Sequence, residues 1–261
     1  INRKENCLQL KKKFQNIIDK ISPFLIIFSI LILWQILSMA GFIPKFMLPS
    51  PISVVKAFIN DFPLLMHHTK FTLSEAFLGL GIGIILGFTM SVIMDTYELA
   101  YKSIYPILVI TQTVPTVAIA PLLVLWLGYG ILPKVTLIVF TSFFPITVGL
   151  LDGFKSVDKD SLNLLKTMGA TTFQNFIHVK LPSSTGYFFS GLRISVSYSV
   201  IGAVVAEWLG GFNGLGVYMT RVRKSYSFDK MFAVIFFISA ISLILMYLVK
   251  KIQKKVMSWE N

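Results

Sequence analysis

Long apolar runs separated by short polar connections dominate this chain of 261 residues. A helix needs about 20 consecutive apolar residues to cross the hydrocarbon core of a bilayer, which is roughly 30 Å thick. The runs lack the residue-by-residue alternation of β-barrel strands, so they predict an all-α membrane protein with six transmembrane helices. The six predicted spans are residues 22–42, 72–94, 104–127, 133–151, 187–207 and 231–249.

Composition and charge also place the chain in a membrane. Hydrophobic residues make up 55% of it and charged residues only 14%, against about 25% charged residues in soluble domains. A net charge of +12 would indicate nucleic acid as the partner of a soluble protein,. In a membrane protein the cations instead report the orientation of the spans, so we expect contact with membrane lipid and no nucleic-acid partner.

Lysines and arginines predict which side of the membrane each loop occupies. Six spans place both termini on one side, and that side carries 15 cations against 8 on the other, with Arg193 inside the fifth span. Because cytoplasmic loops are enriched in cations, both termini are predicted to be cytoplasmic. The cluster 221–224 lies on the outer side in this arrangement.

The segments outside the spans define the domain organisation. Residues 1–21 are either an amphipathic helix on the membrane surface or a solvated tail. No small-residue cleavage site follows the first span, which is therefore expected to be a retained anchor. Helical spacing at 51–65 predicts a short helix at the outer interface, and the single Cys7 permits no internal disulfide. The predicted parts are a cytoplasmic N-terminal segment (1–21), a first transmembrane helix with an outer interfacial segment (22–71), a transmembrane domain (72–250) containing a polar loop (152–186), and a cytoplasmic tail (251–261).

Glycines and prolines mark special positions within the spans. Gly79, Gly83 and Gly87 recur every four residues, a spacing that lets two membrane helices approach closely,. In the third span, prolines at positions 106, 115 and 121 surround the polar run 111–113. Such a break often borders a translocation pathway, although a kinked helix that only packs against its neighbours is an equal alternative.

Polar side chains inside the spans are the candidates for lining a pathway. Uncharged hydroxyl and amide groups offer hydrogen bonds to a small polar solute in transit. Ionisable residues within spans are functional candidates because burying them is costly, although near a span end the charge can reach the interface. The candidates are Gln112, Thr113, Ser142, Arg193, Ser197, Tyr198 and Glu207.

The polar loop contains a predicted helix-turn-helix at 160–182. Leu162, Leu165 and Met168 share one face of a helix, and Gly169 is placed to end it in a left-handed turn. A threonine at 171 or 172 then caps a second helix, which Pro182 is expected to stop before the fifth span. A simple connection needs only a few polar residues, so this partly apolar element is expected to dock on a soluble partner.

The end of this element resembles a known family. Gly169, nine residues, Val179, one residue and then Leu181-Pro182 are similar to the G-x9-I-x-LP end of the EAA motif in permease subunits of bacterial ATP-binding-cassette importers. In that family the loop resembles a lever whose helix inserts into a groove of the cytoplasmic ATPase. Asn163-Leu164-Leu165 replaces Glu-Ala-Ala here, which implies that a charged contact is lost or supplied by a residue such as Asp160.

A second series of residues extends the resemblance. Gly191-Leu192-Arg193, Ala206-Glu207 and Gly214-Leu215-Gly216 are similar to a GLR, AE and GLG series in the branch that imports sulfonates, taurine, nitrate and thiamine-pyrimidine precursors. The run 198–219 most resembles permeases for hydroxymethylpyrimidine-type precursors, with aliphatic sulfonate, taurine or nitrate as the alternative solutes. The resemblance covers about residues 72–249 and implies a type I importer permease of the bacterial inner membrane.

The resemblance also implies partners. Two separate ATPase subunits would bind ATP and Mg²⁺, an extracytoplasmic binding protein would deliver the solute, and a second permease copy would form a homodimer. This chain has no GxxxxGK[ST] motif to cradle ATP phosphates, and no cofactor of its own is expected,. The implied ATPase-coupling residues are Asp160, Leu162, Asn163, Leu165, Met168, Gly169, Phe173, Val179, Leu181 and Pro182.

Two other functions compete with this interpretation. An ion-coupled secondary transporter would need carboxylates within the membrane, and the spans contain only Glu75 and Glu207, both near span ends. A membrane enzyme would need a nucleophile with a base or a metal cluster, and the chain has no HExxH or GxSxG motif,. Adjacent His67 and His68 point in different directions on a helix and have no third ligand nearby, so no metal site is expected.

Overall fold

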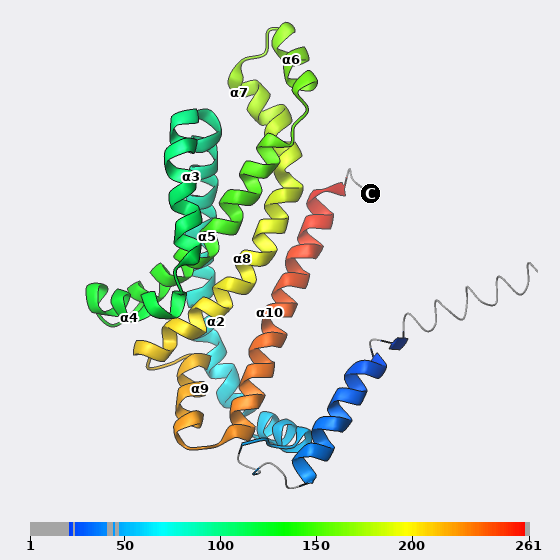
Figure 1. Ribbon diagram of the computed structural model, residues 1–261, viewed down its shortest axis with the longest axis vertical. Helices are drawn as coiled ribbons and strands as arrows, with labels where there is room; N and C mark the ends of the chain where they lie inside the picture. Colours follow the sequence, from blue (N-terminus) through cyan, green and yellow to red (C-terminus); the bar gives the residue numbers. More distant parts are fainter. Residues whose placement is uncertain (1–20, 23, 41–43, 45–46, 259–261) are drawn as a thin grey trace, which may run out of the picture. The chain divides into compact units, whose positions relative to one another are not determined.

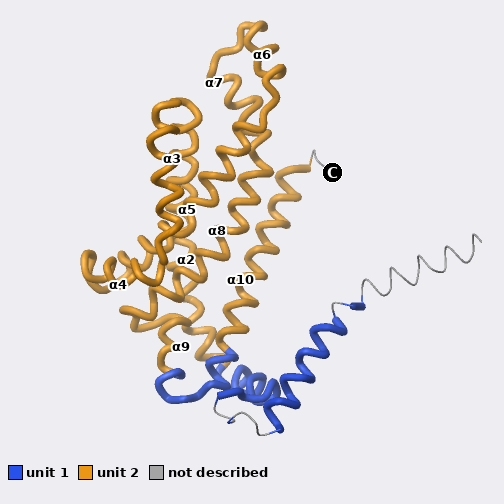
Figure 2. The backbone as a smooth tube through the Cα atoms, viewed as in Figure 1, with its two compact units in different colours: residues 1–61, 222–233 blue, residues 62–221, 234–261 orange. Residues whose placement is uncertain are grey.

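A computed structural model describes residues 21–22, 24–40, 44 and 47–258, and within these residues every regular element is a helix. The predicted N-terminal segment and Cys7 lie outside the described residues, except for position 21. The chain divides into two compact units (Figure 2): residues 1–61 with 222–233, and residues 62–221 with 234–261.

The helices follow one another through short connections (Figure 1). After an apolar helix at Phe24–Met39, the elements are α2 (Pro51–Thr96), α3 (Glu98–Thr113), α4 (Thr116–Leu127), α5 (Ile131–Lys155), α6 (Lys159–Thr167), α7 (Thr172–Asn175), the π-helical turn η1 (Phe176–Lys180), α8 (Leu181–Gly210), α9 (Leu215–Lys224) and α10 (Phe228–Val256).

The all-α membrane fold predicted from the sequence is confirmed. Among the described residues, four helical stretches are long and apolar enough to cross a membrane: α2, α5, Thr172–Gly210 and α10. The pair α3 and α4 gives a fifth candidate, bent by 101° at its break. The helix Phe24–Met39, inside the first predicted span, is a shorter apolar helix. The described residues therefore provide up to five spans by this measure, where the hydropathy pattern predicted six.

The smaller unit is built around a few apolar contacts. Val54, Ala57 and Ala233 are buried together, with Trp34 and Phe232 packed against them. Lys230 forms an ion pair with Asp61 at 2.8 Å. The first turns of α2 and of α10 both contribute to this unit.

The helix α2 corrects one prediction. A short interfacial helix was expected at 51–65, separate from a span at 72–94, but α2 runs without interruption from Pro51 to Thr96. The polar residues between these two stretches do not form a loop: the Thr69 hydroxyl bonds back to the Leu65 carbonyl oxygen one turn earlier, and the Thr72 hydroxyl donates to Glu207 of α8. Polar side chains alone do not end a helix when their groups find partners within it.

The larger unit has α5 and α8 at its centre, side by side along most of their length (Figure 1). Gly191 of α8 lies so close to Pro145 of α5 that a Cβ atom would collide with the Pro145 carbonyl group. Ile146, Leu150 and Phe154 of α5 are buried together with Phe189 of α8 in the main apolar cluster. This packing fixes the two helices that wall the site described below.

The predicted glycine face of α2 packs against α5. Ideal Cβ atoms built at Gly79, Gly83 and Gly87 would meet Ile138, Ser142 and Ile146 of α5, respectively. These contacts come one turn apart, as the four-residue spacing predicts. The close-packing interpretation of the three glycines is therefore confirmed.

Candidate functional site

The polar loop begins with a capped helix. Asp158 is the N-cap of α6, and its carboxylate accepts hydrogen bonds from the N–H groups of Asp160 and Ser161 at 3.2 Å. These bonds, together with one from the Ser161 hydroxyl, hold the pKa of Asp158 below its usual value. They favour the ionised form of the side chain, which also suits the positive end of the helix dipole.

Gly169 ends α6 as predicted. Its φ angle of 84° lies in the left-handed region, where a side chain is strained. The N–H of Gly169 bonds to the carbonyl oxygen of Lys166, and the N–H of Ala170 bonds to that of Leu165. This pair of bonds is the Schellman arrangement, which satisfies the last carbonyl groups of the helix.

The second helix of the loop differs from the prediction at its far end. Thr171 caps α7, and its side chain and that of Gln174 bond reciprocally to backbone N–H groups. Pro182 does not stop this helix, because the chain remains helical from Thr172 to Gly210. The π-helical turn η1 lies directly before α8, and Pro182 stands in the first turn of α8. A proline is tolerated in a first turn, and the wider π turn precedes it without a break.

Apolar side chains of the loop are exposed to solvent on one part of its surface. Met168 is 75% exposed, Phe173 71% and Leu164 62%. Leu162 and Leu165 are half-buried. The three exposed side chains come from both arms of the helix-turn-helix, so the loop presents an unpartnered apolar surface in this structure. Leu164 was not predicted to belong to it.

A cavity of about 540 Å³ separates the loop from the end of α2. Val92, Asp95 and Thr96 line it from α2, whereas Leu162 and Phe173 line it from the loop. Next to it, both oxygens of Asp95 accept hydrogen bonds from Lys180, at 2.9 and 2.7 Å.

A buried polar network lies at the opposite end of α8 from the loop. The Glu207 carboxylate accepts hydrogen bonds from the Thr72 hydroxyl at 2.7 Å and from the Gly216 N–H at 2.6 Å. Thr72 in turn accepts from the Leu215 N–H at 2.9 Å, and His68 accepts from the Gly214 N–H at 3.0 Å. The start of α9 is therefore capped by three side chains from α2 and α8.

This network gives the AE and GLG series a structural reason. Gly214 has a φ of 126°, and a Cβ atom there would collide with the Glu207 carboxylate. A Cβ atom at Gly216 would meet the Val204 carbonyl oxygen as well as Glu207. The two glycines let the chain after α8 close around a buried carboxylate.

A second buried carboxylate has a cationic partner. Glu75 of α2 forms an ion pair with Lys134 of α5 at 2.6 Å, and both side chains are nearly inaccessible to solvent. Sequence reasoning placed Glu75 and Glu207 near span ends, yet each is buried and engaged in bonds that hold helices together.

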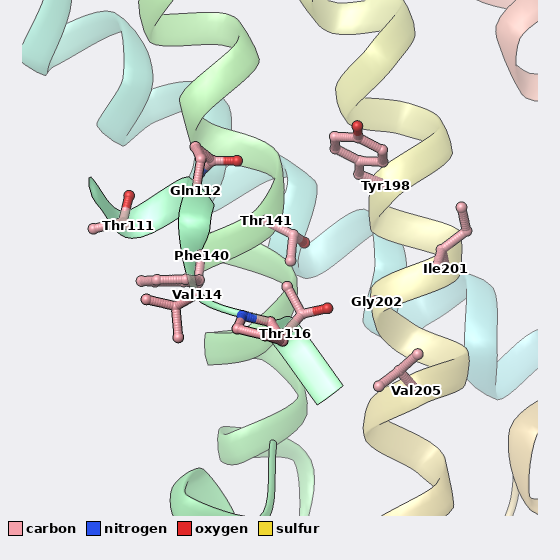
Figure 3. A pocket seen from close by; sticks show the side chains of 11 residues that line it. Thr111, Gln112, Val114, Thr116, Phe140, Thr141, Tyr198, Ile201, Gly202 and Val205 are labelled. Carbon is pink, nitrogen blue, oxygen red and sulfur yellow. The ribbon is translucent and has the colours of Figure 1, made fainter. Parts of the chain in front are cut away.

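The break between α3 and α4 borders a cavity of about 320 Å³ (Figure 3). The predicted interruption of the third span is confirmed at Pro115, the N-cap of α4, whereas the prolines at 106 and 121 lie inside helices. Gln112 and Tyr198 extend toward one another from α3 and α8, and Thr141 faces the same space from α5. Among the described residues that line this cavity, none carries a charge: they are Thr111, Gln112, Val114, Pro115, Thr116, Phe140, Thr141, Tyr198, Ile201, Gly202 and Val205.

A second cavity, of about 430 Å³, shares two of these residues. Gln112 and Tyr198 line both spaces, and Asp152, Tyr187 and Ser190 line the second one nearer the polar loop. Two predicted pathway residues therefore border both cavities.

The other predicted pathway residues lie outside these two cavities. Ser142 is buried on α5 and donates to the Ile138 carbonyl oxygen, and Thr113 is exposed and donates to that of Ile110. Arg193 donates to Ser190 at 3.1 Å, and Ser197 is half-buried on α8. Of the neighbours Thr141 and Ser142, it is Thr141 that faces the cavity, a choice that depends on the exact rotation of α5.

Membrane-spanning helices border two cavities, one of which has no charged residue in its described lining, and the polar loop exposes apolar side chains. These features are typical of a membrane transport protein that works with a soluble partner. Residues 79–258 match the family described as "Binding-protein-dependent transport system inner membrane component". The chain belongs to this family. It is thus a multi-pass permease of an ATP-binding-cassette importer, a class in which ATP hydrolysis takes place on a separate subunit.

Individual relatives support this assignment. The chain is 37% identical to the formylaminopyrimidine transport permease protein ThiX of Halalkalibacterium halodurans, over 97% of this chain and 99% of that one. It is 26% identical to SsuC of Bacillus subtilis, a permease named for aliphatic sulfonates, over 89% of this chain and 85% of that one. The fold is similar to the crystal structure of an amino acid ABC transporter with histidines, with a TM-score of 0.61 and 15% identity over 76% of this chain and 94% of that one.

Proposed function

We propose that this permease carries a small uncharged pyrimidine of the thiamine-precursor type, and that the solute passes the cavities at Gln112 and Tyr198. The observation that carries the proposal is the uncharged lining of the cavity at the α3–α4 break. Its amide and hydroxyl groups can donate to and accept from ring nitrogens and an amino group, and Tyr198 offers an aromatic face for stacking. The relative named for formylaminopyrimidine supports the same solute class.

Aliphatic sulfonate, taurine and nitrate are the alternative solutes, and a sulfonate permease is among the relatives. All three carry a negatively charged group that must leave water on the way through the membrane. An anion that enters a low-dielectric cavity without a cationic or hydrogen-bonded partner loses several kcal/mol of solvation, by order of magnitude. The first cavity has no cation among its described lining residues, and the second has Asp152, which repels anions. Both features favour the neutral solute.

We infer the partners from the family to which the chain belongs and from the exposed apolar side chains of the polar loop. Two ATPase subunits, which hold ATP and Mg²⁺, dock on the polar loops of two permease copies through Leu164, Met168 and Phe173. A solute-binding protein delivers the solute on the opposite side. The polar loop and both chain termini then lie in the cytoplasm, in agreement with the distribution of cations along the sequence,.

The solute is tested by reconstituting the permease in liposomes with its ATPase and binding protein, and by measuring ATP hydrolysis and uptake. Formylaminopyrimidine, an aliphatic sulfonate, taurine and nitrate are supplied one at a time. We expect the pyrimidine alone to stimulate hydrolysis and to enter the liposomes. Stimulation by one of the anionic solutes instead would overturn the pyrimidine proposal and leave the importer mechanism in place.

The docking surface is tested by co-purification with the ATPase. Met168→Asp places a charge in the apolar surface of the loop and is expected to abolish the complex. Leu99→Asp is the matched control, because Leu99 is 79% exposed and lies on α3, outside the loop. A complex that survives Met168→Asp and is lost in Leu99→Asp would contradict this docking surface.

A further inference from the structure

An ion pair joins the end of η1, where the polar loop meets α8, to the last turn of α2. Lys180 bonds to both oxygens of Asp95, and the Asp95 and Lys180 side chains are only 12% and 24% exposed. Two bonds to one carboxylate at partly buried positions give a defined geometry, unlike most surface pairs. Lys180 occupies the position between Val179 and Leu181 for which the EAA-type motif specifies no residue.

The same turn of chain has a second attachment. Phe176, at the start of η1, packs on the buried Phe154 of α5 with ring centroids 5.4 Å apart. Lys180, at the end of η1, holds α2. A π-helical turn is rare and often marks a functional site. This irregular turn therefore has one contact to α5 at its start and one to α2 at its end.

The helix α2 is in turn locked to α5. Its glycine face fits against Ser142 and Ile146, and the Ser91 hydroxyl lies 3.2 Å from the Thr147 carbonyl oxygen of α5. Thr141, which faces the cavity, is a neighbour of these contact residues on α5. A displacement of α2 is thus passed to a wall of the cavity through close backbone packing, which resists compression.

We propose that Asp95 and Lys180 are positioning residues: their ion pair makes α2 move together with the polar loop, so that motion imposed on the loop reaches α5 through α2 as well as along the chain. Without the pair, η1 flexes and part of the motion is lost before it reaches the cavity. This inference rests on the proposed function of the loop as the ATPase contact. Beyond that function, the inference makes α2 a second path for the motion. It also gives Asp95 and Lys180 a positioning role that the sequence pattern did not indicate.

The test compares Lys180→Met, Asp95→Asn and the charge-swapped double variant Asp95→Lys with Lys180→Asp, all in liposomes with the ATPase and binding protein. Each single variant is expected to keep the ATPase bound and to hydrolyse ATP, while the solute taken up per ATP falls about five-fold or more. The swapped pair is expected to restore much of this ratio. A residue that only stabilises the fold would lower the amount of assembled complex and not the ratio.

Lys102→Met is the matched control, because Lys102 pairs with Glu98 at 2.7 Å on an exposed surface of α3, where the pair contributes little,. Unchanged uptake per ATP in both single variants, or no recovery in the swapped pair, would overturn the inference. If Asp95→Asn fails to assemble, Lys180→Met decides, since it removes the cation of the same pair: a lowered ratio supports the inference and a normal ratio overturns it. Loss of ATPase binding in the unaltered protein would instead reject the proposed function.

Discussion

At the scale of the residue, the hydroxyl group of Thr72 joins Glu207 of α8 to the first residue of α9. It donates to Glu207 and accepts from the N–H of Leu215, and it is fully buried. Thr72→Val keeps the shape but removes the acceptor of the Leu215 N–H and one of the donors to the Glu207 carboxylate. This loss is expected to cost about 1–3 kcal/mol in the free energy of unfolding. Thermal unfolding in detergent measures this loss.

Thr89→Val is the control for that change. Thr89 lies on the same helix, but it is exposed and bonds only to the Ile85 carbonyl oxygen one turn before. Its replacement is expected to leave the unfolding temperature nearly unchanged. Equal losses in the two variants would show that the network contributes nothing beyond the local bond.

A comparison of variants at Gln112 and at its neighbour Thr113 tests whether Gln112 contributes to the pathway. Gln112 lines both cavities, whereas Thr113 bonds to its own helix at Ile110. If Gln112 bonds to the solute in transit, Gln112→Ala removes about 1 kcal/mol of stabilisation from the transition state for passage. The maximal uptake rate then falls about five-fold. Thr113→Ala is expected to keep the normal rate. Uptake assays at saturating binding protein measure both, and identical rates in both variants would remove Gln112 from the pathway.

At the scale of the element, the turn after α6 needs a glycine at position 169 for its backbone conformation and not for space around it. A Cβ atom at Gly169 would meet nothing within 4 Å, so Gly169→Val is penalised only by its φ of 84°, at about 1 kcal/mol or more. The turn is expected to open and to uncouple ATP hydrolysis from uptake. Gly128→Val is the control, because Gly128 has a φ of 76° and equally open surroundings outside the loop. A normal amount of uptake per ATP hydrolysed in Gly169→Val would contradict the role of the loop as a lever.

The helix α6 is expected to depend on pH through its cap. Since the hydrogen bonds lower the pKa of Asp158 in the folded chain, its contribution is present at neutral pH and is lost as the pH falls through that lowered pKa,. Amide protection in α6, corrected for intrinsic exchange rates, should therefore fall below about pH 4. Asp158→Asn caps the helix without a charge and should show no such step. A step of equal size in this variant would assign the effect to another carboxylate.

Local rules predicted the elements that local groups control. The left-handed stop at Gly169, a threonine cap at 171 or 172, the glycine face of α2 and a break in the third span all follow from the conformational limits of single residues. The structure then selects Thr171 as the cap and Pro115 as the break. The uninterrupted α2 and the helical passage through Pro182 did not, because both depend on hydrogen bonds that form one turn away. Helix continuity is a property of several residues together, and a polar residue or a proline read alone does not decide it.

At the scale of the whole molecule, sequence patterns indicated the membrane fold and the family, but only part of the site. Gln112 and Tyr198 were found because a broken span and polar side chains mark a pathway. Thr141 was not selected, since the rotation of α5 is set by packing against α2 and α8. The Asp95–Lys180 pair joins residues 85 positions apart, and no local pattern relates them.

The length of α2 between Thr72 and Asp95, two of its polar contact residues, has a consequence for the surrounding lipid. Thr72, near the middle of α2, meets Glu207, and Asp95, in the last turn of α2, meets Lys180. The 23 residue steps from Thr72 to Asp95 rise about 35 Å. This is close to the roughly 30 Å thickness of the hydrocarbon core, so we expect the two contacts to lie at opposite faces of the bilayer. A membrane that is too thick or too thin would strain both contacts through tilt. Uptake per ATP is therefore expected to be highest in dioleoyl phosphatidylcholine and lower in the thinner dimyristoyl and thicker dierucoyl bilayers. Equal uptake per ATP in all three lipids would show that the distance between the two contacts is not matched to the bilayer thickness.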